Sequence, residues 1–98
     1  MEIKFRLEYE MSVVKEDIPR LSHPAKLRIK RAIEEKLTSS PEVFGKPLRK
    51  SLKGYRSLRI GDYRVIFRIC VDEDPAKNAV KIFAIMHRSA TYKTKRLN

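Results

Sequence analysis

The dipeptide Gly61-Asp62 lies between two segments in which every second residue is apolar. This pattern constrains the fold more than any other feature of the sequence. Apolar side chains occupy every second position in 58–60 and in 63–71, which is the period of half-buried strands. Glycine at the first position of a two-residue loop fits a type II′ turn, whose twist matches that of the flanking strands. The sequence therefore predicts a tight β-hairpin.

The hairpin fixes which residues face each other, and it predicts the pairs Ile60 with Tyr63, Arg59 with Arg64, Leu58 with Val65, and Tyr55 with Arg68. Because side chains alternate between the two faces of a strand, Arg59 and Arg64 project together, away from their apolar neighbours. Like charges directly opposite each other destabilise a sheet, which favours an anion between the two arginines. The alternative is a solvated face on which the long side chains spread apart.

The remaining elements follow from periodicity and from the positions of proline and glycine. We expect a strand over 3–9, a helix over 12–21 capped by Ser12 and interrupted at Pro19, an amphipathic helix over 24–38, a loop over 39–54 and a strand over 79–86. The last strand is apolar on both faces, as expected near the centre of a sheet. This order predicts an α+β fold in which two amino-terminal helices pack on one face of a small antiparallel sheet.

Length and composition indicate one soluble domain, residues 1–98, without a metal or cofactor. The chain has 98 residues, of which 42% are hydrophobic and 36% charged, enough for one modest core. The apolar run Ile82–Met86 is far too short to cross a bilayer, and the first residues lack the apolar block of a secretory signal, so we expect a cytoplasmic protein. Cys70 has no cysteine partner, and with His23 and His87 it makes no zinc-ligand set.

Positive charge is concentrated in the second half of the chain. The formal net charge is +11; residues 1–43 hold 9 basic and 8 acidic side chains, whereas residues 44–98 hold 14 basic and 4 acidic. An excess of this size in one part of a small domain favours a polyanionic partner, either nucleic acid or an acidic protein. The alternative is a solvated surface that only keeps the protein soluble.

The residues after the last predicted strand are candidates for chemistry. His87 is suited to act as a general acid or base, Arg88 to hold a phosphate, and Tyr92 to stack on a base or donate a proton. Structural interpretations compete with these roles, because a histidine at a strand end is often held by hydrogen bonds and a carboxy-terminal tyrosine often packs on the core.

The run KGYRSLRIGDYRVIFRI at 53–69, together with Ile85-Met86-His87-Arg88 and Tyr92, resembles the RelE/ParE superfamily of toxins from bacterial and archaeal toxin–antitoxin pairs. The segment 41–48 and the preceding helix are also similar, so the resemblance covers nearly the whole chain. It implies a RelE-like, microbial ribonuclease-like fold with a basic concave face. It leaves two functions open: a ribosome-dependent endoribonuclease that cleaves messenger RNA, or an inhibitor of DNA gyrase of the ParE type.

The resemblance also implies site residues and partners. Arg64, Arg88 and Tyr92 match family positions, and Arg59 approximates a basic position on the earlier strand, where Ser57 stands in place of a second basic residue. His87 and Tyr92 are the candidates for the general base. The partners implied are the ribosome with its messenger RNA and a cognate antitoxin with an acidic segment. Six further cations of this half are expected to bind RNA or the ribosome: Lys46, Arg49, Lys50, Lys53, Arg56 and Arg68.

Overall fold

A computed structural model describes residues 4–90 of the chain. In chain order the elements are β1 (Arg6–Tyr9), the π-helical turn η1 (Val13–Asp17), the 3-10 turn η2 (Ile18–Arg20), α1 (His23–Ala32), the π-helical turn η3 (Ile33–Leu37), α2 (Pro41–Phe44), β2 (Lys46–Pro47), the 3-10 turn η4 (Lys50–Leu52), β3 (Arg56–Ile60), β4 (Tyr63–Cys70), the 3-10 turn η5 (Pro75–Lys77) and β5 (Ala79–His87). The α+β class predicted from the sequence is confirmed.

Both predicted helical segments are present in the amino-terminal half. The first comprises η1 and η2, and Pro19 sits in the first turn of η2, where a missing N–H costs little. The prediction that Ser12 caps this segment is wrong, because Ser12 itself has helical backbone angles and its side chain makes no capping hydrogen bond. The second comprises α1 and η3, and it begins after Ser22, whose hydroxyl oxygen accepts the Ala25 N–H at 3.3 Å.

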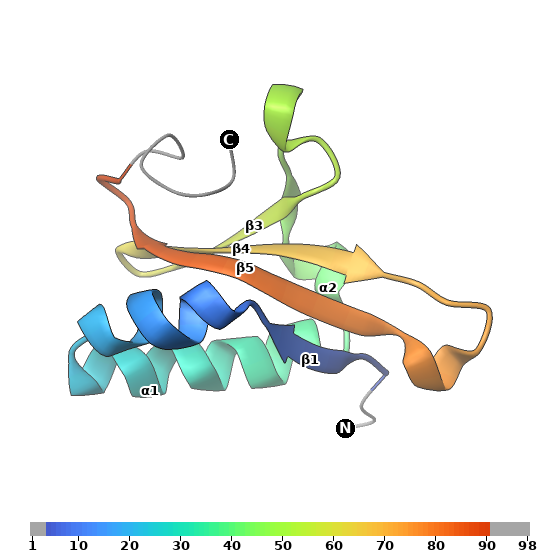
Figure 1. Cartoon of the computed structure of the whole chain (residues 1–98), viewed down its shortest axis with the longest axis horizontal. Coiled ribbons are helices and arrows are strands. Elements are labelled where there is room, and N and C mark those ends of the chain that lie inside the picture. Colours follow the sequence, from blue (N-terminus) through green and yellow to red (C-terminus); the bar gives the residue numbers. More distant parts are fainter. Residues whose placement is uncertain (1–3, 91–98) are drawn as a thin grey trace.

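The five strands form one sheet in the order β1-β5-β4-β3-β2, with the helical segments on one face (Figure 1). Strands β3 and β4 pair as predicted from Ile60 with Tyr63 through Leu58 with Val65, so the hairpin register is confirmed. Gly61 has φ +59 and Asp62 does not share this positive φ, as a type II′ turn requires. The ladder ends at Arg56 with Phe67, one pair before the predicted pair of Tyr55 with Arg68.

The sheet differs from the prediction at both edges. Strand β1 runs parallel to its neighbour β5, with Leu7 opposite Val80, whereas the other pairs are antiparallel. The helices carry the chain from β1 across one face to β2 at the opposite edge. Segment 39–54, which the sequence indicated to be a loop, contains α2, β2 and η4. Such short elements leave too little periodicity to be recognised in a sequence.

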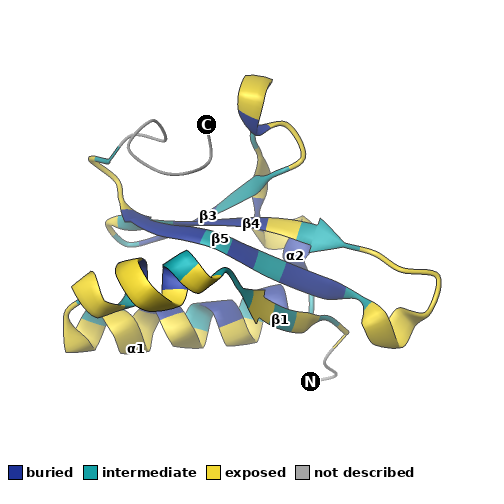
Figure 2. Cartoon of the chain, viewed as in Figure 1, coloured by how far each residue is buried: buried dark blue, intermediate teal, exposed yellow. Residues whose placement is uncertain are grey.

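The main core lies between the helical layer and the sheet, and the central strands are the most deeply buried part of the molecule (Figure 2). It is built by Val13, Ile29, Ile33, Leu37, Leu58, Ile60, Val65, Phe67, Val80, Ile82 and Ile85. The buried carboxylate of Asp17 accepts the Ile85 N–H at 2.9 Å and so ties η1 to the centre of β5. None of the helices within residues 4–90 is long and apolar enough to span a membrane.

A second, smaller apolar cluster lies on the other face of the sheet. Its buried members are Ile66, Ala84 and Met86, and Leu48, Tyr55, Phe83 and Ala90 pack against them. Within residues 4–90 this face carries no helical layer, and the segment that contains η4 rises from it (Figure 1). We call it the open face, and the strand register places Lys46, Arg59, Arg64 and Arg68 on it.

Candidate nucleic-acid interface

The arginine pair at the centre of the prediction lies on the open face. Arg59 and Arg64 are direct partners across the β3–β4 hairpin, while the adjacent pair of Leu58 and Val65 is buried in the main core. Arg59 is exposed and Arg64 is half-buried. Neither guanidinium is in an ion pair with a carboxylate among residues 4–90. Two cations without a carboxylate partner among these residues therefore occupy directly opposite positions of the hairpin.

Arg88 lies at the same end of the sheet, beside the hairpin turn. Its backbone N–H donates to the Asp62 carbonyl at 2.7 Å, and its Nε lies 3.7 Å from the Asp62 carboxylate. It follows Met86, the cross-strand partner of Arg64, by two positions. The ion pair is exposed on both sides, so it holds Arg88 only weakly and leaves the guanidinium available to a ligand.

His87 is not part of this group. It pairs with Tyr63, whose ring packs against the main core, and the two rings meet edge-on with centroids 5.5 Å apart. Because neighbouring residues of a strand point to opposite faces, Tyr63 and His87 lie across the sheet from Arg64. The Ser89 N–H donates to Nδ1 of His87 at 3.2 Å. The structure thus places the His87 ring on the opposite face of the sheet from Arg64. The candidate Tyr92 lies outside the described residues.

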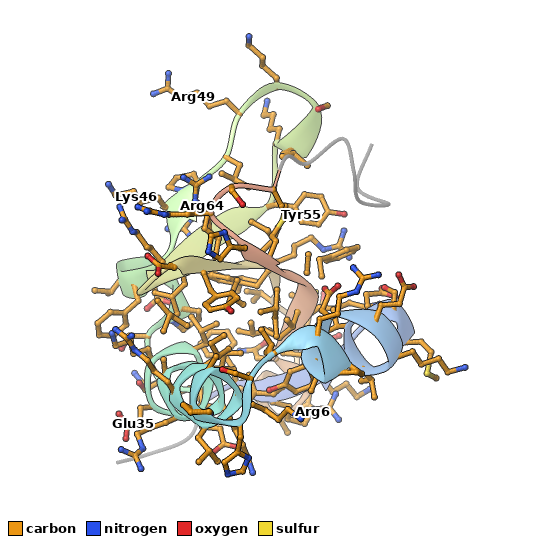
Figure 3. All side chains as sticks on the ribbon, turned by 90° about the vertical axis from the view of Figure 1, so that its left-hand side faces the viewer. Arg6, Glu35, Lys46, Arg49, Tyr55 and Arg64 are labelled. Atoms are coloured by element: carbon orange, nitrogen blue, oxygen red, sulfur yellow. The ribbon has the colours of Figure 1, made fainter. Side chains whose placement is uncertain are left out.

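The predicted binding cations of segment 46–53 lie at one edge of the open face, on β2 and the segment that follows it. Lys46 is opposite Ser57 in the β2–β3 pair, and it points from the same side of the sheet as Arg64 (Figure 3). Arg49, Lys50 and Lys53 are exposed on the segment that rises from this face, whose base is closed by the Leu48 N–H donating to the Tyr55 carbonyl at 2.9 Å. Lys50 has φ +58, a strained conformation of the kind found at functional sites.

The other two predicted binding residues differ from each other. Arg68 is exposed opposite Lys81, which is paired with Glu10 at 3.1 Å. Arg56 instead points toward α2, where its Nη2 donates to the carbonyl oxygens of Glu42 and Gly45 at 2.9 and 2.7 Å. The Nη2 group of Arg56 thus holds α2 against the sheet, so Arg68 is the better placed of the two for a ligand.

Two aromatic residues of the open face were missed by the sequence analysis as functional residues. Tyr55 and Phe83 meet edge-on with ring centroids 4.6 Å apart, and both are half-buried. A register shift between β4 and β5 at Ile66/Phe67 places Phe83 at a bulge, and it packs on the open face together with its neighbour Ala84. The period-2 pattern cannot reveal such a bulge. The rings add a stacking surface to the basic face.

This fold, two amino-terminal helical segments on a five-stranded and mostly antiparallel sheet, is that of RelE-like toxins. The chain matches the family model described as "ParE toxin of type II toxin-antitoxin system, parDE" over residues 13–92. It therefore belongs to the RelE/ParE family of toxins of type II toxin–antitoxin systems.

Individual relatives agree with this assignment. Toxin RelE of Mycobacterium tuberculosis (strain ATCC 25618 / H37Rv) is 44% identical over 57 residues, which cover 58% of this chain and 55% of that protein. The match thus spans about half the length of the relative. Among solved structures, the toxin–antitoxin complex RelBE2 from M. tuberculosis matches with a TM-score of 0.75 and 24% identity over 92% of this chain and 98% of that one. The isolated Escherichia coli RelE toxin matches with a TM-score of 0.66 and 16% identity over 92% and 90%. At such identities the two structures establish the fold alone.

The arginine pair generates a prediction about stability. Replacing Arg64 with Gln removes the like-charge repulsion with Arg59 and should raise the free energy of unfolding by about 0.2–1 kcal/mol. The gain should shrink at high salt, which screens the repulsion. Arg49→Gln, which removes the same charge from the exposed segment, is the matched control. Urea unfolding at two salt concentrations measures both. Equal changes in the free energy of unfolding of the two variants would show that repulsion between Arg59 and Arg64 does not destabilise the fold.

Proposed function

We propose that this chain is a ribosome-dependent endoribonuclease that cleaves messenger RNA. The observation that carries the proposal is the Arg59–Arg64 pair, two guanidinium groups without carboxylate partners among the described residues, with Arg88 at the same end of the sheet. Guanidinium forks remain charged and bind phosphate oxygens bidentately. Similarity to a protein named Toxin RelE supports this function.

In the proposed reaction the 2′-hydroxyl oxygen of one nucleotide attacks the adjacent phosphorus. The bond from phosphorus to the 5′-oxygen breaks, which leaves a 2′,3′-cyclic phosphate on one product and a 5′-hydroxyl on the other. The hydroxyl proton passes to a base, and the leaving oxygen takes up a proton. Negative charge increases on the phosphate oxygens in the transition state, so Arg59, Arg64 and Arg88 stabilise it electrostatically. Holding the hydroxyl in line supplies further acceleration.

Proton transfer is assigned to Tyr92 in this proposal. His87, the other candidate, packs on Tyr63 on the side of the sheet that faces the helices, away from the arginine pair. Tyr92 follows Arg88 by four positions in the sequence. Tyr92→Phe should therefore slow cleavage more than His87→Gln does.

The alternative function is inhibition of DNA gyrase. It is favoured by the matching family model, whose description names ParE toxins. A gyrase inhibitor would bind through its surface and would not need cations arranged around a scissile phosphate.

The activity is tested on programmed ribosomes. The purified protein should cut messenger RNA on the ribosome, leave free RNA largely intact, and fail on a messenger with a 2′-deoxynucleotide at the cleavage position, because the nucleophile is then missing. Primer extension locates the new ends. Intact messenger together with inhibition of gyrase supercoiling would replace this proposal with the alternative.

Replacement of the arginines distinguishes a role in catalysis from a role in binding alone. Arg64→Ala and Arg88→Ala should each lower the single-turnover cleavage rate by roughly 10²–10³, comparable to the loss of one preorganised donor. Arg6→Ala is the control, because Arg6 is an exposed arginine of the edge strand β1, which β5 separates from the hairpin, and it lies away from Arg64 in Figure 3. Parental rates for Arg64→Ala and Arg88→Ala at saturating ribosomes would show that these residues only bind.

We also propose that an antitoxin masks the basic face. The RelBE2 relative was solved as a toxin–antitoxin complex, and the excess of cations after residue 43 suits a partner with an acidic segment. The product of a small open reading frame beside this gene should therefore copurify with the protein and restore growth. Failure of both would refute this partner.

A further inference from the structure

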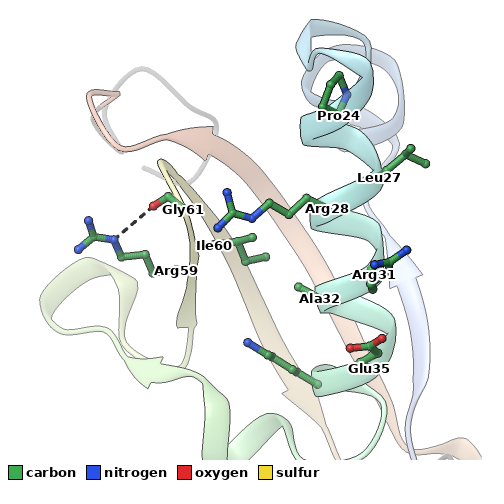
Figure 4. A pocket seen from close by; sticks show the side chains of 10 residues that line it. Pro24, Leu27, Arg28, Arg31, Ala32, Glu35, Arg59, Ile60 and Gly61 are labelled. Carbon is green, nitrogen blue, oxygen red and sulfur yellow. Dashed lines mark hydrogen bonds between the residues drawn. The ribbon is translucent and has the colours of Figure 1, made fainter.

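A basic cavity lies beyond the hairpin turn, next to the proposed cleavage site, with which it shares Arg59. It has a volume of about 500 Å³ and is bounded by α1 with η3 on one side and by the end of β3 with Gly61 on the other (Figure 4). The apolar groove on the opposite flank of α1 is separate from it, and is lined by Val14, Ile18, Leu21 and neighbouring residues.

The lining of this cavity is predominantly cationic. Arg28, Arg31 and Lys36 come from the helical segment and Arg59 from β3, against the single carboxylate of Glu35. Within residues 4–90 none of the four cations is in an ion pair. The Lys36 ammonium lies 5.5 Å from the centre of the Phe44 ring. Arg28 and Arg31 are exposed and their charges are available to a ligand.

The cavity is joined to the arginine pair at Gly61. The Arg28 guanidinium lies so close to this glycine that a Cβ atom there would be 2.7 Å from Nη1, and Arg59 Nε donates to the Gly61 carbonyl at 3.4 Å. Arg28 and Arg59 thus approach the turn from two sides (Figure 4). Since Arg59 is also the cross-strand partner of Arg64, it connects this cavity with the arginine pair of the hairpin.

We propose that this cavity is a second phosphate-binding subsite for RNA, which the strand reaches by crossing the hairpin turn from the open face. The inference rests on the proposed function and adds a path for the RNA beyond the scissile phosphate. A polynucleotide suits a line of guanidinium groups, because its phosphates recur along the strand. A protein partner would be expected to bury apolar anchors, and the surface suited to that is the separate groove on the other flank of α1.

The test compares two double variants that remove equal charge from opposite flanks of one helix. Arg28→Gln with Arg31→Gln alters the cavity, whereas Lys26→Gln with Lys30→Gln alters the flank beside the apolar groove. The probe is a fluorescent single-stranded RNA with all 2′-hydroxyls methylated, which binds without being cut. Its affinity is measured by anisotropy at several salt concentrations, after thermal melts have established that both variants fold.

If the subsite exists, the arginine variant should reduce the steepness of the plot of log affinity against log salt by about 1.4, because each of two lost phosphate contacts contributes about 0.7. The lysine variant should reduce this steepness by less than half as much. Equal slopes for the two variants, or no binding of this RNA by the parent, would overturn the proposal. So would loss of polyglutamate binding in the arginine variant with unchanged RNA binding, which would assign the cavity to an acidic protein. Because the probe cannot be cut, a parent that fails to cleave on ribosomes but gives the expected slopes would refute the proposed function and leave the subsite standing.

Discussion

The register of the β3–β4 hairpin is the constraint on which the rest of this molecule depends. Gly61 turns the chain with φ +59, and from that turn the pairing of each residue up to Arg56 with Phe67 follows. A slip by one residue would exchange the faces, burying the arginines and exposing Leu58 and Val65. The same register therefore specifies both the core and the basic face. Gly61 also leaves space for the Arg28 guanidinium, which any side chain would occupy.

The division of the sheet into two unlike faces follows from this register. One face is covered by helical segments and carries the larger core, and Asp17 anchors that layer to β5 through the Ile85 N–H. Among residues 4–90 the other face buries only a small cluster around Ile66 and Met86 and carries no helical layer (Figure 1). An open, cationic face opposes folding through charge repulsion, and the helix-covered core offsets that cost through apolar burial. Binding of a polyanion would neutralise the repulsion.

Much of this arrangement can be predicted from the sequence, because it depends on contacts between residues that are close in the chain. Alternation and the glycine turn predict the hairpin, its register and the adjacency of Arg59 and Arg64, all of which the structure confirms. Features that depend on contacts between residues far apart in the sequence cannot be predicted in this way. The parallel pairing of β1 depends on β5, and the bulge that leaves Phe83 beside Ala84 depends on β4. The sequence predicts Arg56 to be a surface cation because it is an arginine in a basic segment. In the structure, the position of α2 lets its Nη2 group donate to backbone carbonyls instead.

The central claim is that the hairpin register places two arginines on one phosphate, and a double-mutant cycle tests it most directly. Single-turnover cleavage on ribosomes is measured for Arg59→Ala, Arg64→Ala and the double variant, with Arg59 and Arg68 as the control cycle. If both guanidinium groups hold the same phosphate, the double variant should lose less than the two single losses combined, with a coupling of about 1 kcal/mol or more. Losses that add to within about 0.5 kcal/mol, as expected of independent sites, would contradict the account.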